Sequence, residues 1–289
     1  MTVHPIPVNA LAAPRRLRAP VGKVVQQSLP QHPQVEYFLY VPRTAPARDA
    51  PMVVSVHGIA RNAVEHAFRF RDWAERTGCV LVAPLFRRDR FGQYQQLLPG
   101  GTGLLRADLM LHAIADEAAR ITGADAGRLH MFGFSGGGQF VHRFAMAWPE
   151  RVAAAVVGAA GWYTAPDPSL RYPWGLGLEG GSAELRFEPE RFLRVPAHVI
   201  VGARDVDRDP ALRKSKRLDR LQGRNRVERG RRWIEAMRAA SEGRGLDGGR
   251  FSFTELPGAD HSFTAAATRW GLGEQVFGLF EFEALHVSA

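Results

Sequence analysis

The sequence has little cysteine, little lysine and no long apolar run. Its 289 residues include a single cysteine, Cys79, which excludes an intrachain disulfide and a metal site built from several cysteines. No apolar run approaches the roughly 18 residues of a membrane span, so we expect no membrane partner. Arg15, Arg16 and Arg18 are followed by Ala19–Lys23, where a secretion signal needs its apolar stretch. We therefore expect a cytoplasmic protein.

Lysine is rare among the basic side chains. Only three of the 38 are lysines, at positions 23, 214 and 216, and the formal net charge is +9. An arginine excess of this kind, together with abundant alanine and glycine, is typical of GC-rich coding. We therefore expect no nucleic-acid partner. A basic surface nevertheless produces a field that attracts anions.

Length and composition indicate one large domain. A chain of 289 residues is near the upper limit for a single hydrophobic core. Its apolar fraction of 45% and charged fraction of 23% are ordinary globular values. We predict an N-terminal arm over residues 1–33, with one short strand near Lys23–Ser28. A single domain follows over 34–289, with an insertion rich in proline and glycine at about 162–195.

Apolar runs and amphipathic stretches alternate along the chain. Met52–Val56 and Cys79–Ala83 are short continuous apolar runs, typical of strands buried on both faces of a parallel sheet. Further strands are predicted over Gln34–Val41, Arg128–Phe134, Val152–Ala159, Ala197–Val201 and Phe251–Leu256. Helices are predicted over Ala63–Arg76, Leu105–Ile121, Gly136–Trp148, Val227–Ser241 and Thr268–Phe282. This alternation predicts an α/β protein with an open, mostly parallel sheet and helices on both faces.

Two of these helices have an expected inward face. In the first, the side chains available for one face are Val64, Ala67, Phe68 and Trp73. In the helix before the last strand, apolar or small residues recur at steps of three and four. These are Val227, Gly230, Ile234, Met237 and Ser241.

A glycine-rich turn joins a predicted strand to a predicted helix. Residues 133–137 read Gly-Phe-Ser-Gly-Gly. A turn this sharp puts the serine in a strained conformation, and the glycines remove side chains that would clash. The following helix N-terminus directs backbone N–H groups at an anion beside Ser135. We predict that Ser135 is a nucleophile on a nucleophile elbow; the alternative is a plain glycine-rich turn with a capping serine.

A serine hydroxyl needs a base, and an imidazole is the usual one. At a strand-turn-helix site of this kind the chain order is nucleophile, acid, histidine. His261 lies in a loop that leaves the last predicted strand, where it can reach the serine. His286 is three residues from the C-terminus, where chains fray. We predict that His261 is the base, and that His142 is a core or helix-surface residue.

The acid is expected just past the predicted strand Ala197–Val201. Two carboxylates lie there, Asp205 and Asp207, and we favour Asp205, three residues after the glycine at the strand end. Its role would be to accept the Nδ1–H of His261 and to stabilise the imidazolium. Asp260 is adjacent to His261 in sequence, and neighbouring side chains rarely face each other, so we expect it to be structural.

A second turn follows another buried strand at Val56–Ala60. There a backbone N–H, that of Ile59, can point toward the serine and form an oxyanion hole with the N–H of Gly136. We expect His57 to be structural and to hold this turn. A metal site at His57 and His66 lacks supporting ligand spacing, so we expect no metal and no cofactor.

These four elements, in this order, resemble the α/β-hydrolase superfamily over roughly residues 34 to 285. Within it the chain is similar to the polyhydroxybutyrate depolymerase-like and feruloyl-esterase-like serine esterases, with the dienelactone-hydrolase type as a near neighbour. The resemblance implies the α/β-hydrolase fold, with a catalytic triad of Ser135, Asp205 and His261 and with Ile59 and Gly136 as oxyanion donors. Extracellular polymer depolymerases carry a secretion signal and often disulfides, which we do not expect here.

The substrate side is less specific. Ligands of open α/β sheets bind at the carboxyl ends of the strands. Trp162 and Tyr163 follow the strand next to that of the nucleophile, so they are candidates for substrate binding; the alternative is that they belong to the core. Residues 207–232 hold eleven basic and four acidic side chains, which form either a solvated face or an anion-attracting rim.

Two functions from different classes follow from these residues. The first is a serine hydrolase that cleaves a small or medium carboxylic ester through an acyl-enzyme on Ser135. The second is a non-hydrolytic protein of the same fold that binds a ligand or partner. A complete serine, histidine and carboxylate set favours the first, because a binding protein has no need of it. Thioesterase, lactonase and peptidase activities use the same machinery and stay open, as does the oligomeric state.

Overall fold

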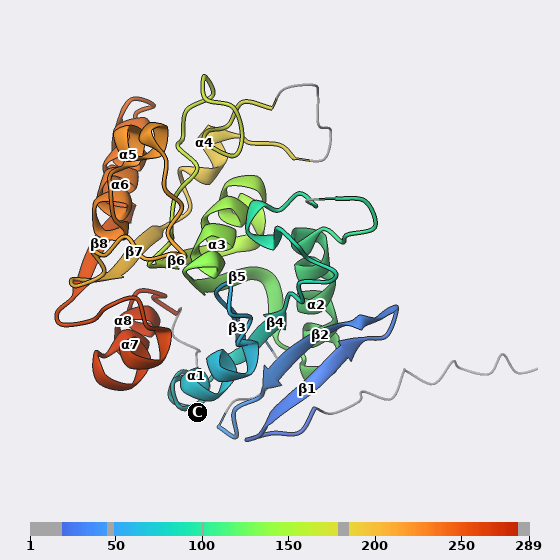
Figure 1. Cartoon of the computed structure of the whole chain (residues 1–289). Helices are drawn as coiled ribbons and strands as arrows, with labels where there is room; N and C mark the ends of the chain where they lie inside the picture. Colours follow the sequence, from blue (N-terminus) through green and yellow to red (C-terminus); the bar gives the residue numbers. More distant parts are fainter. Residues whose placement is uncertain (1–18, 45–48, 100, 179–184, 283–289) are drawn as a thin grey trace, which may run out of the picture.

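The computed structural model describes residues 19–44, 49–99, 101–178 and 185–282. Within these ranges eight strands form one sheet in the order β1-β2-β4-β3-β5-β6-β7-β8 (Figure 1). The bounds are β1 Val24–Leu29, β2 His32–Tyr40, β3 Pro51–Val56, β4 Val80–Leu85, β5 Asp125–Phe134, β6 Val152–Gly158, β7 Ala197–Gly202 and β8 Phe251–Leu256. Strand β2 is antiparallel to both of its neighbours, β1 and β4. The six strands from β4 to β8 in the sheet order are parallel to one another. The predicted fold class, a mostly parallel α/β sheet, is confirmed.

Helices cover both faces of the sheet (Figure 1). Their bounds are α1 Ala63–Thr77, α2 Ala107–Thr122, α3 Gly136–Ala147, α4 Pro189–Phe192, α5 Lys216–Gln222, α6 Arg226–Glu242, α7 Phe263–Arg269 and α8 Leu272–Gly278. Three short 3-10 helices are η1 Tyr94–Gln96, η2 Pro149–Arg151 and η3 Gly248–Arg250. Buried side chains of α2, α3 and α6 share one core, and those of α1, α7 and α8 share the other. No helix within the described residues is long and apolar enough to cross a membrane.

The central strands contribute to both cores. Val54 packs in the core with α2 and α3, while its neighbour Val53 packs in the core with α1 and α7. Successive side chains of a strand point to opposite faces, so a strand covered on both sides is apolar at nearly every position. This explains the continuous apolar runs of β3 and β4. The exception in β3 is the buried Ser55, whose Oγ lies 2.8 Å from Nδ1 of His66. Because β3, β5, β6, β7 and β8 are parallel, their carboxyl ends lie at one edge of the sheet.

The buried face of α1 differs from the predicted one. Val64 and Phe68 are 40% and 49% exposed, whereas Ala67, Phe70 and Ala74 are fully buried. Residues 63, 67, 70 and 74 follow the three- and four-residue spacing of one helix face. The predicted stripe was one residue out of phase at Val64 and Phe68, which turns those side chains about 100° away from the core.

The chain end also differs from prediction. The expected helix over Thr268–Phe282 is two short helices, α7 and α8, which are separated at Gly271. Gly271 has φ of +67°, a left-handed conformation through which an α-helix cannot continue. His286 lies outside the described residues.

At the other end, the sheet begins before the predicted arm boundary at residue 33. Val24 of β1 pairs with Tyr40 of β2 as the first pair of an antiparallel hairpin. The strand expected near Lys23–Ser28 is therefore β1, and it belongs to the sheet. The rest of the predicted arm, residues 1–18, lies outside the described residues, as does 179–184 of the expected insertion.

Candidate active site

Ser135 lies at the sharp turn between β5 and α3. Its φ is +56° and its ψ is −110°, which is unusual for a residue with a side chain. The turn brings backbone very close to two glycines. A Cβ on Gly133 would lie 2.2 Å from the carbonyl oxygen of Gly137, and one on Gly137 would lie 2.0 Å from that of Val56. Only glycine fits at either position, so these two residues allow the chain to turn sharply with the half-buried serine at the strand end.

Three side chains from different elements form one hydrogen-bonded series at this edge. The Oγ of Ser135 lies 3.1 Å from Nε2 of His261, and Nδ1 of His261 lies 2.6 Å from Oδ2 of Asp205. His261 follows β8 and Asp205 follows β7. An ionised carboxylate only accepts, so Nδ1 carries the proton and Nε2 is free to accept from the serine hydroxyl.

The structure therefore brings together the three residues predicted as nucleophile, acid and base. Asp205 is 2% exposed, whereas Asp207 and Asp260 lie on the surface. The loops after β7 and β8 are joined by backbone hydrogen bonds, from Arg204 N–H to the carbonyl of Ala259 at 2.9 Å and from Ala203 N–H to that of Leu256 at 3.0 Å. These bonds hold the aspartate loop against the histidine loop.

Arg226, the first residue of α6, is a site residue that sequence reasoning missed. Its Nη1 donates to Oδ1 of Asp205 at 2.9 Å and to Oδ2 of Asp209 at 2.5 Å. The side chains of Arg226 and Asp205 are each 1% exposed. The Arg226 hydrogen bond lowers the pKa of Asp209 to about 2. Nothing in the spacing of residues 205 and 226 marks this pair, because the two meet only when α6 packs beside β7 in the folded chain.

The two predicted oxyanion donors lie side by side. A Cβ on Gly136 would be 3.3 Å from the backbone nitrogen of Ile59. The carbonyl of Gly58 lies 2.8 Å from Nδ1 of His57 and accepts from Arg61 N–H at 3.0 Å. Because C=O and N–H of a trans peptide point in opposite directions, the Ile59 N–H points away from His57. The Gly136 N–H belongs to the first turn of α3, where it has no intrahelical acceptor.

His57 holds this turn, as the sequence predicts. Its Nε2 accepts from the backbone N–H of Phe86 at 3.0 Å, so Nδ1 is protonated and donates to Gly58. Burial lowers the pKa of His57 to about 4, which keeps the ring neutral. The hydroxyl of Tyr94 donates to the His57 carbonyl at 2.8 Å. Within the described ranges, no group of three or more His, Cys, Asp or Glu residues could hold a metal.

Several solved structures that match this chain are hydrolases. The chain matches poly(aspartic acid) hydrolase-1 from Sphingomonas sp. KT-1 at 22% identity, over 85% of this chain and 93% of that one, with a TM-score of 0.71. It matches LpqC, a poly(3-hydroxybutyrate) depolymerase from Bordetella parapertussis, at 26% identity over 85% and 88%, with a TM-score of 0.67. An S-formylglutathione hydrolase from Agrobacterium tumefaciens matches at 17% identity over 86% and 89%, with a TM-score of 0.57. The chain has the α/β-hydrolase fold. No family model and no curated protein sequence matches it.

Of the two aromatic residues predicted to bind substrate, one lies in the core of this α/β-hydrolase fold. Tyr163 is 1% exposed and its ring stacks on that of Trp233 of α6, with centroids 5.0 Å apart. The prediction that Tyr163 lines the substrate site is therefore corrected, because α6 covers its ring. Trp162 is 4% exposed and lies between two guanidinium groups, those of Arg143 at 4.4 Å and Arg213 at 5.1 Å from its ring centre.

Proposed function

We propose that the protein is a serine hydrolase that cleaves a small or medium carboxylic ester through an acyl-enzyme on Ser135. The observation that carries the proposal is the hydrogen-bonded series from Ser135 through His261 to Asp205, next to the backbone nitrogens of Ile59 and Gly136. The hydrolase names of the matched structures support the same general class.

Acylation uses each of these groups once. Oγ of Ser135 attacks the ester carbonyl carbon while Nε2 of His261 takes the hydroxyl proton. The carbonyl oxygen becomes an oxyanion, which the N–H groups of Ile59 and Gly136 stabilise. Asp205 holds the imidazole in the tautomer that can accept at Nε2 and stabilises the imidazolium. The tetrahedral intermediate then collapses, the C–O bond to the alcohol breaks, and His261 returns its proton to the leaving oxygen.

Deacylation repeats these steps with water. His261 takes a proton from a water molecule whose oxygen attacks the acyl carbon, and the same two N–H groups hold the second oxyanion. The bond to Oγ breaks and His261 protonates Ser135. The balance is one ester and one water consumed, and one carboxylic acid and one alcohol released. No cofactor or metal takes part in this scheme.

The test is a panel of p-nitrophenyl esters with and without a serine-directed phosphonate. We expect turnover that the phosphonate abolishes, with the added mass on the peptide that contains Ser135. A Ser135→Ala variant should take up no label, while Ser169→Ala, a change in an exposed loop, should label normally. Labelling at another serine, or turnover that survives the phosphonate, would refute the proposal. A thioester and an amide of the same acyl group separate esterase from thioesterase and peptidase activity.

A further inference from the structure

Three arginine and two tryptophan side chains pack together beside the carboxyl edge of the sheet, and the rings of Trp162 and Trp174 are in contact, with centroids 5.0 Å apart. Trp162 lies between Arg143 and Arg213, as described above. The Arg213 guanidinium also lies 5.0 Å from the ring centre of Trp174, and that of Arg217 lies 5.6 Å from the same ring. We call these five residues the arginine–tryptophan stack. It joins α3 to the loop after β6 and to the segment after β7.

The inner end of the stack is a buried cation without a counter-ion among the residues that the structure describes. Arg143 is 0% exposed, and its Nε and Nη1 donate only to neutral oxygens, those of Thr164, Gln95 and Gln139. Its Nη2 is buried without a hydrogen-bond partner in the described part of the chain. Burial lowers the pKa of Arg143 to about 10, so it stays charged at neutral pH. It therefore places an uncompensated positive charge behind the ring of Trp162.

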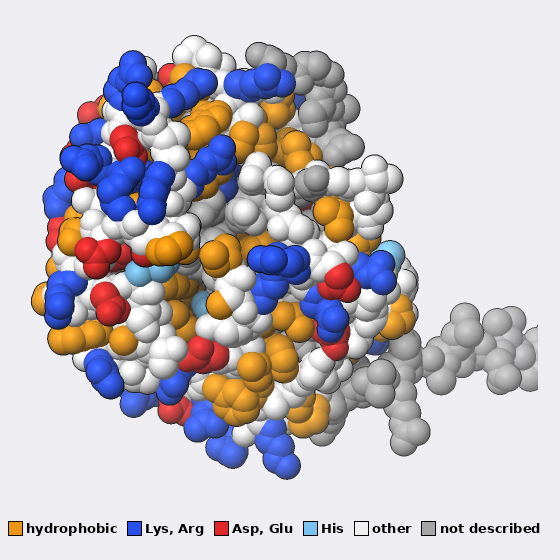
Figure 2. Space-filling view, viewed as in Figure 1, with side chains coloured by type: hydrophobic (Ala, Val, Ile, Leu, Met, Phe, Trp, Pro, Cys, Tyr) orange, Lys and Arg blue, Asp and Glu red, His pale blue; other side chains and the backbone are white. Residues whose placement is uncertain are grey.

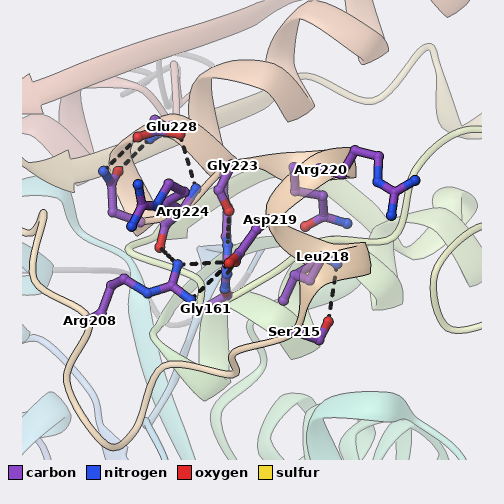
Figure 3. Close-up of polar contacts among 12 residues, drawn as sticks. Gly161, Arg208, Ser215, Leu218, Asp219, Arg220, Gly223, Arg224 and Glu228 are labelled. Atoms are coloured by element: carbon purple, nitrogen blue, oxygen red, sulfur yellow. Dashed lines mark hydrogen bonds and ion pairs between the residues drawn. The ribbon is translucent and has the colours of Figure 1, made fainter.

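The structure separates the basic residues of the segment after β7 into two groups. One group is internally paired: Arg208 and Arg229 both bind Asp219, and Arg226 binds Asp205 and Asp209. In Figure 3 the Arg208 guanidinium points at the Asp219 carboxylate from the segment that leads into α5. These arginines hold the segment in place, so they are not available to a ligand.

The second group has no ion pair within the described residues. Its members are Arg204, Arg213, Lys214, Lys216, Arg217, Arg220, Arg224 and Arg232. Two acidic residues of this stretch also lack an ion pair there: Asp207, which is exposed, and Glu228, which accepts from the backbone N–H of Arg224 at 3.0 Å. Figure 2 shows the result as lysine and arginine side chains that gather over α5. Charges of one sign at a rim concentrate anions there.

The stack is connected to Ser135 through β6 and α3. The Ser135 N–H donates to the carbonyl of Gly158, the last residue of β6, at 2.7 Å, and Trp162 follows four residues later in the loop after β6. Gln139, one turn along α3 from Ser135, accepts from Arg143 and lies against Gly161, where a Cβ would be 3.2 Å from its Nε2. The stack therefore extends outward from the nucleophile, and its outermost members, Arg213 and Arg217, are exposed.

We propose that the arginine–tryptophan stack is a carboxylate-binding subsite, so that the ester cleaved at Ser135 carries a free carboxylate on its acyl part. The inference rests on the proposed hydrolase function. Guanidinium groups match a carboxylate with two parallel N–H donors, and a ring that already holds a guanidinium flat orients that fork. The exposed Arg213 and Arg217 supply these donors, the Trp174 ring orients them, and Arg143 adds its field from behind Trp162.

The test compares two p-nitrophenyl esters of equal chain length, the mono-ester of adipic acid and its methyl-capped neutral counterpart. We expect kcat/KM to favour the anionic ester by about tenfold at 0.02 M salt. The preference should shrink toward one at 0.5 M salt, as the screening length falls. In the Arg213→Gln/Arg217→Gln double variant, the ratio of the two kcat/KM values should be close to one at both salt concentrations.

The matched control is Arg71→Gln/Arg76→Gln. Both guanidinium groups lie over aromatic rings of α1, at 5.7 Å from Phe68 and 4.8 Å from Trp73, and the double change removes the same net charge. Because α1 starts at the carboxyl edge, its second half, which holds both arginines, lies farther from that edge. This control should keep the anionic preference. An unchanged ratio in the Arg213/Arg217 variant, or an equal loss in the control, would overturn the subsite.

Failure of the proposed function gives a different result. If neither ester is hydrolysed, the hydrolase proposal fails, and the subsite is tested alone by titrating adipate against tryptophan fluorescence. Saturable quenching in the native chain that is absent from Arg213→Gln/Arg217→Gln would support the subsite. Equal responses from both proteins would refute it.

Discussion

Arg226 and Asp205 form a buried ion pair on the side of the carboxylate that faces away from His261. Nη1 of Arg226 lies 2.9 Å from Oδ1, and Nδ1 of His261 lies 2.6 Å from Oδ2. Each carboxylate oxygen thus has one of these two partners. A carboxylate removed from water needs such partners, because its desolvation costs several kcal/mol. Arg226 therefore fixes the position of the Asp205 carboxylate, with its other oxygen directed at the histidine.

Removing this cation should damage both stability and turnover. Arg226→Met leaves Oδ1 of Asp205 buried without its donor, and we expect a loss of about 3–5 kcal/mol in the free energy of unfolding. Arg226→Lys keeps the charge and should lose less. Urea unfolding and kcat on a neutral p-nitrophenyl ester measure the two effects. The control is Asp209→Asn, which removes the outer negative charge but keeps an acceptor oxygen. If this variant loses as much stability as Arg226→Met, the ion pair between Arg226 and Asp205 is not the one that stabilises the fold.

The two aspartates after β7 should differ strongly in function. Asp205→Asn should lower kcat by about 10⁴, because an amide can favour the wrong histidine tautomer. Asp207→Asn should cost less than tenfold, since Asp207 is exposed and lies outside the series. Steady-state kinetics on the same ester compares the variants. Small and equal losses at both positions would exclude Asp205 as the orienting acid.

The parts of the site that could be predicted have local signals in the sequence. Continuous apolar runs predicted β3 and β4, and the glycines on either side of Ser135 predicted the turn, because the close backbone approaches there leave no room for a Cβ. His261 and Asp205 could be chosen by their positions just after predicted strands. In an open parallel sheet those positions meet at one edge, so strand assignment alone brings the three residues together.

The parts that could not be predicted depend on contacts between distant segments. Arg226 was one of eleven basic residues in its stretch, and its choice of partner follows from how α6 packs. Tyr163 was assigned to the substrate site because it follows a strand, but Trp233 covers its ring. The predicted buried face of α1 was wrong because it too depends on contacts with a distant segment, the sheet. Apolar Phe68 is exposed while Ala67 and Ala74 are buried, because the sheet needs small side chains at close contacts.

The strained backbone at Ser135 allows two variants of this residue to lose activity equally while they differ in stability. Its φ of +56° with ψ of −110° disfavours any residue that carries a Cβ, at a cost of about 1–3 kcal/mol. Ser135→Gly relieves this strain and Ser135→Ala keeps it. We expect both variants to lose about 10⁴–10⁶ in kcat, and the glycine variant to be more stable than the alanine variant by about 1 kcal/mol or more. Guanidinium unfolding of the two proteins measures the difference. An alanine variant as stable as the glycine variant would limit the strain to the roughly 0.4–1 kcal/mol that glycine loses through the entropy of its unfolded chain.

His57 should make stability fall in acid. Burial lowers the pKa of His57 to about 4, below the ordinary value of 6.5 that applies in the unfolded chain. Between these values the unfolded chain binds a proton that the folded chain does not, so lowering the pH favours unfolding. The contribution is fully present above pH 6.5 and is lost as the pH falls toward 4. The loss is about 1.4 kcal/mol per pH unit, or about 3 kcal/mol in all.

A His57→Gln variant isolates this effect from the other buried histidines. A glutamine amide can accept from the Phe86 N–H and donate to the Gly58 carbonyl, as the neutral imidazole does, but it has no proton to gain. Unfolding in urea is measured at pH 7, 6, 5 and 4.5. Between pH 6 and 4.5 the free energy of unfolding of the variant should fall less steeply than that of the native protein, by about 1.4 kcal/mol per pH unit. Any constant difference at pH 7 reflects the altered side-chain fit. Parallel curves over the whole range would mean that His57 takes up its proton in the folded state, and that the ring is not held neutral against the Gly58 carbonyl.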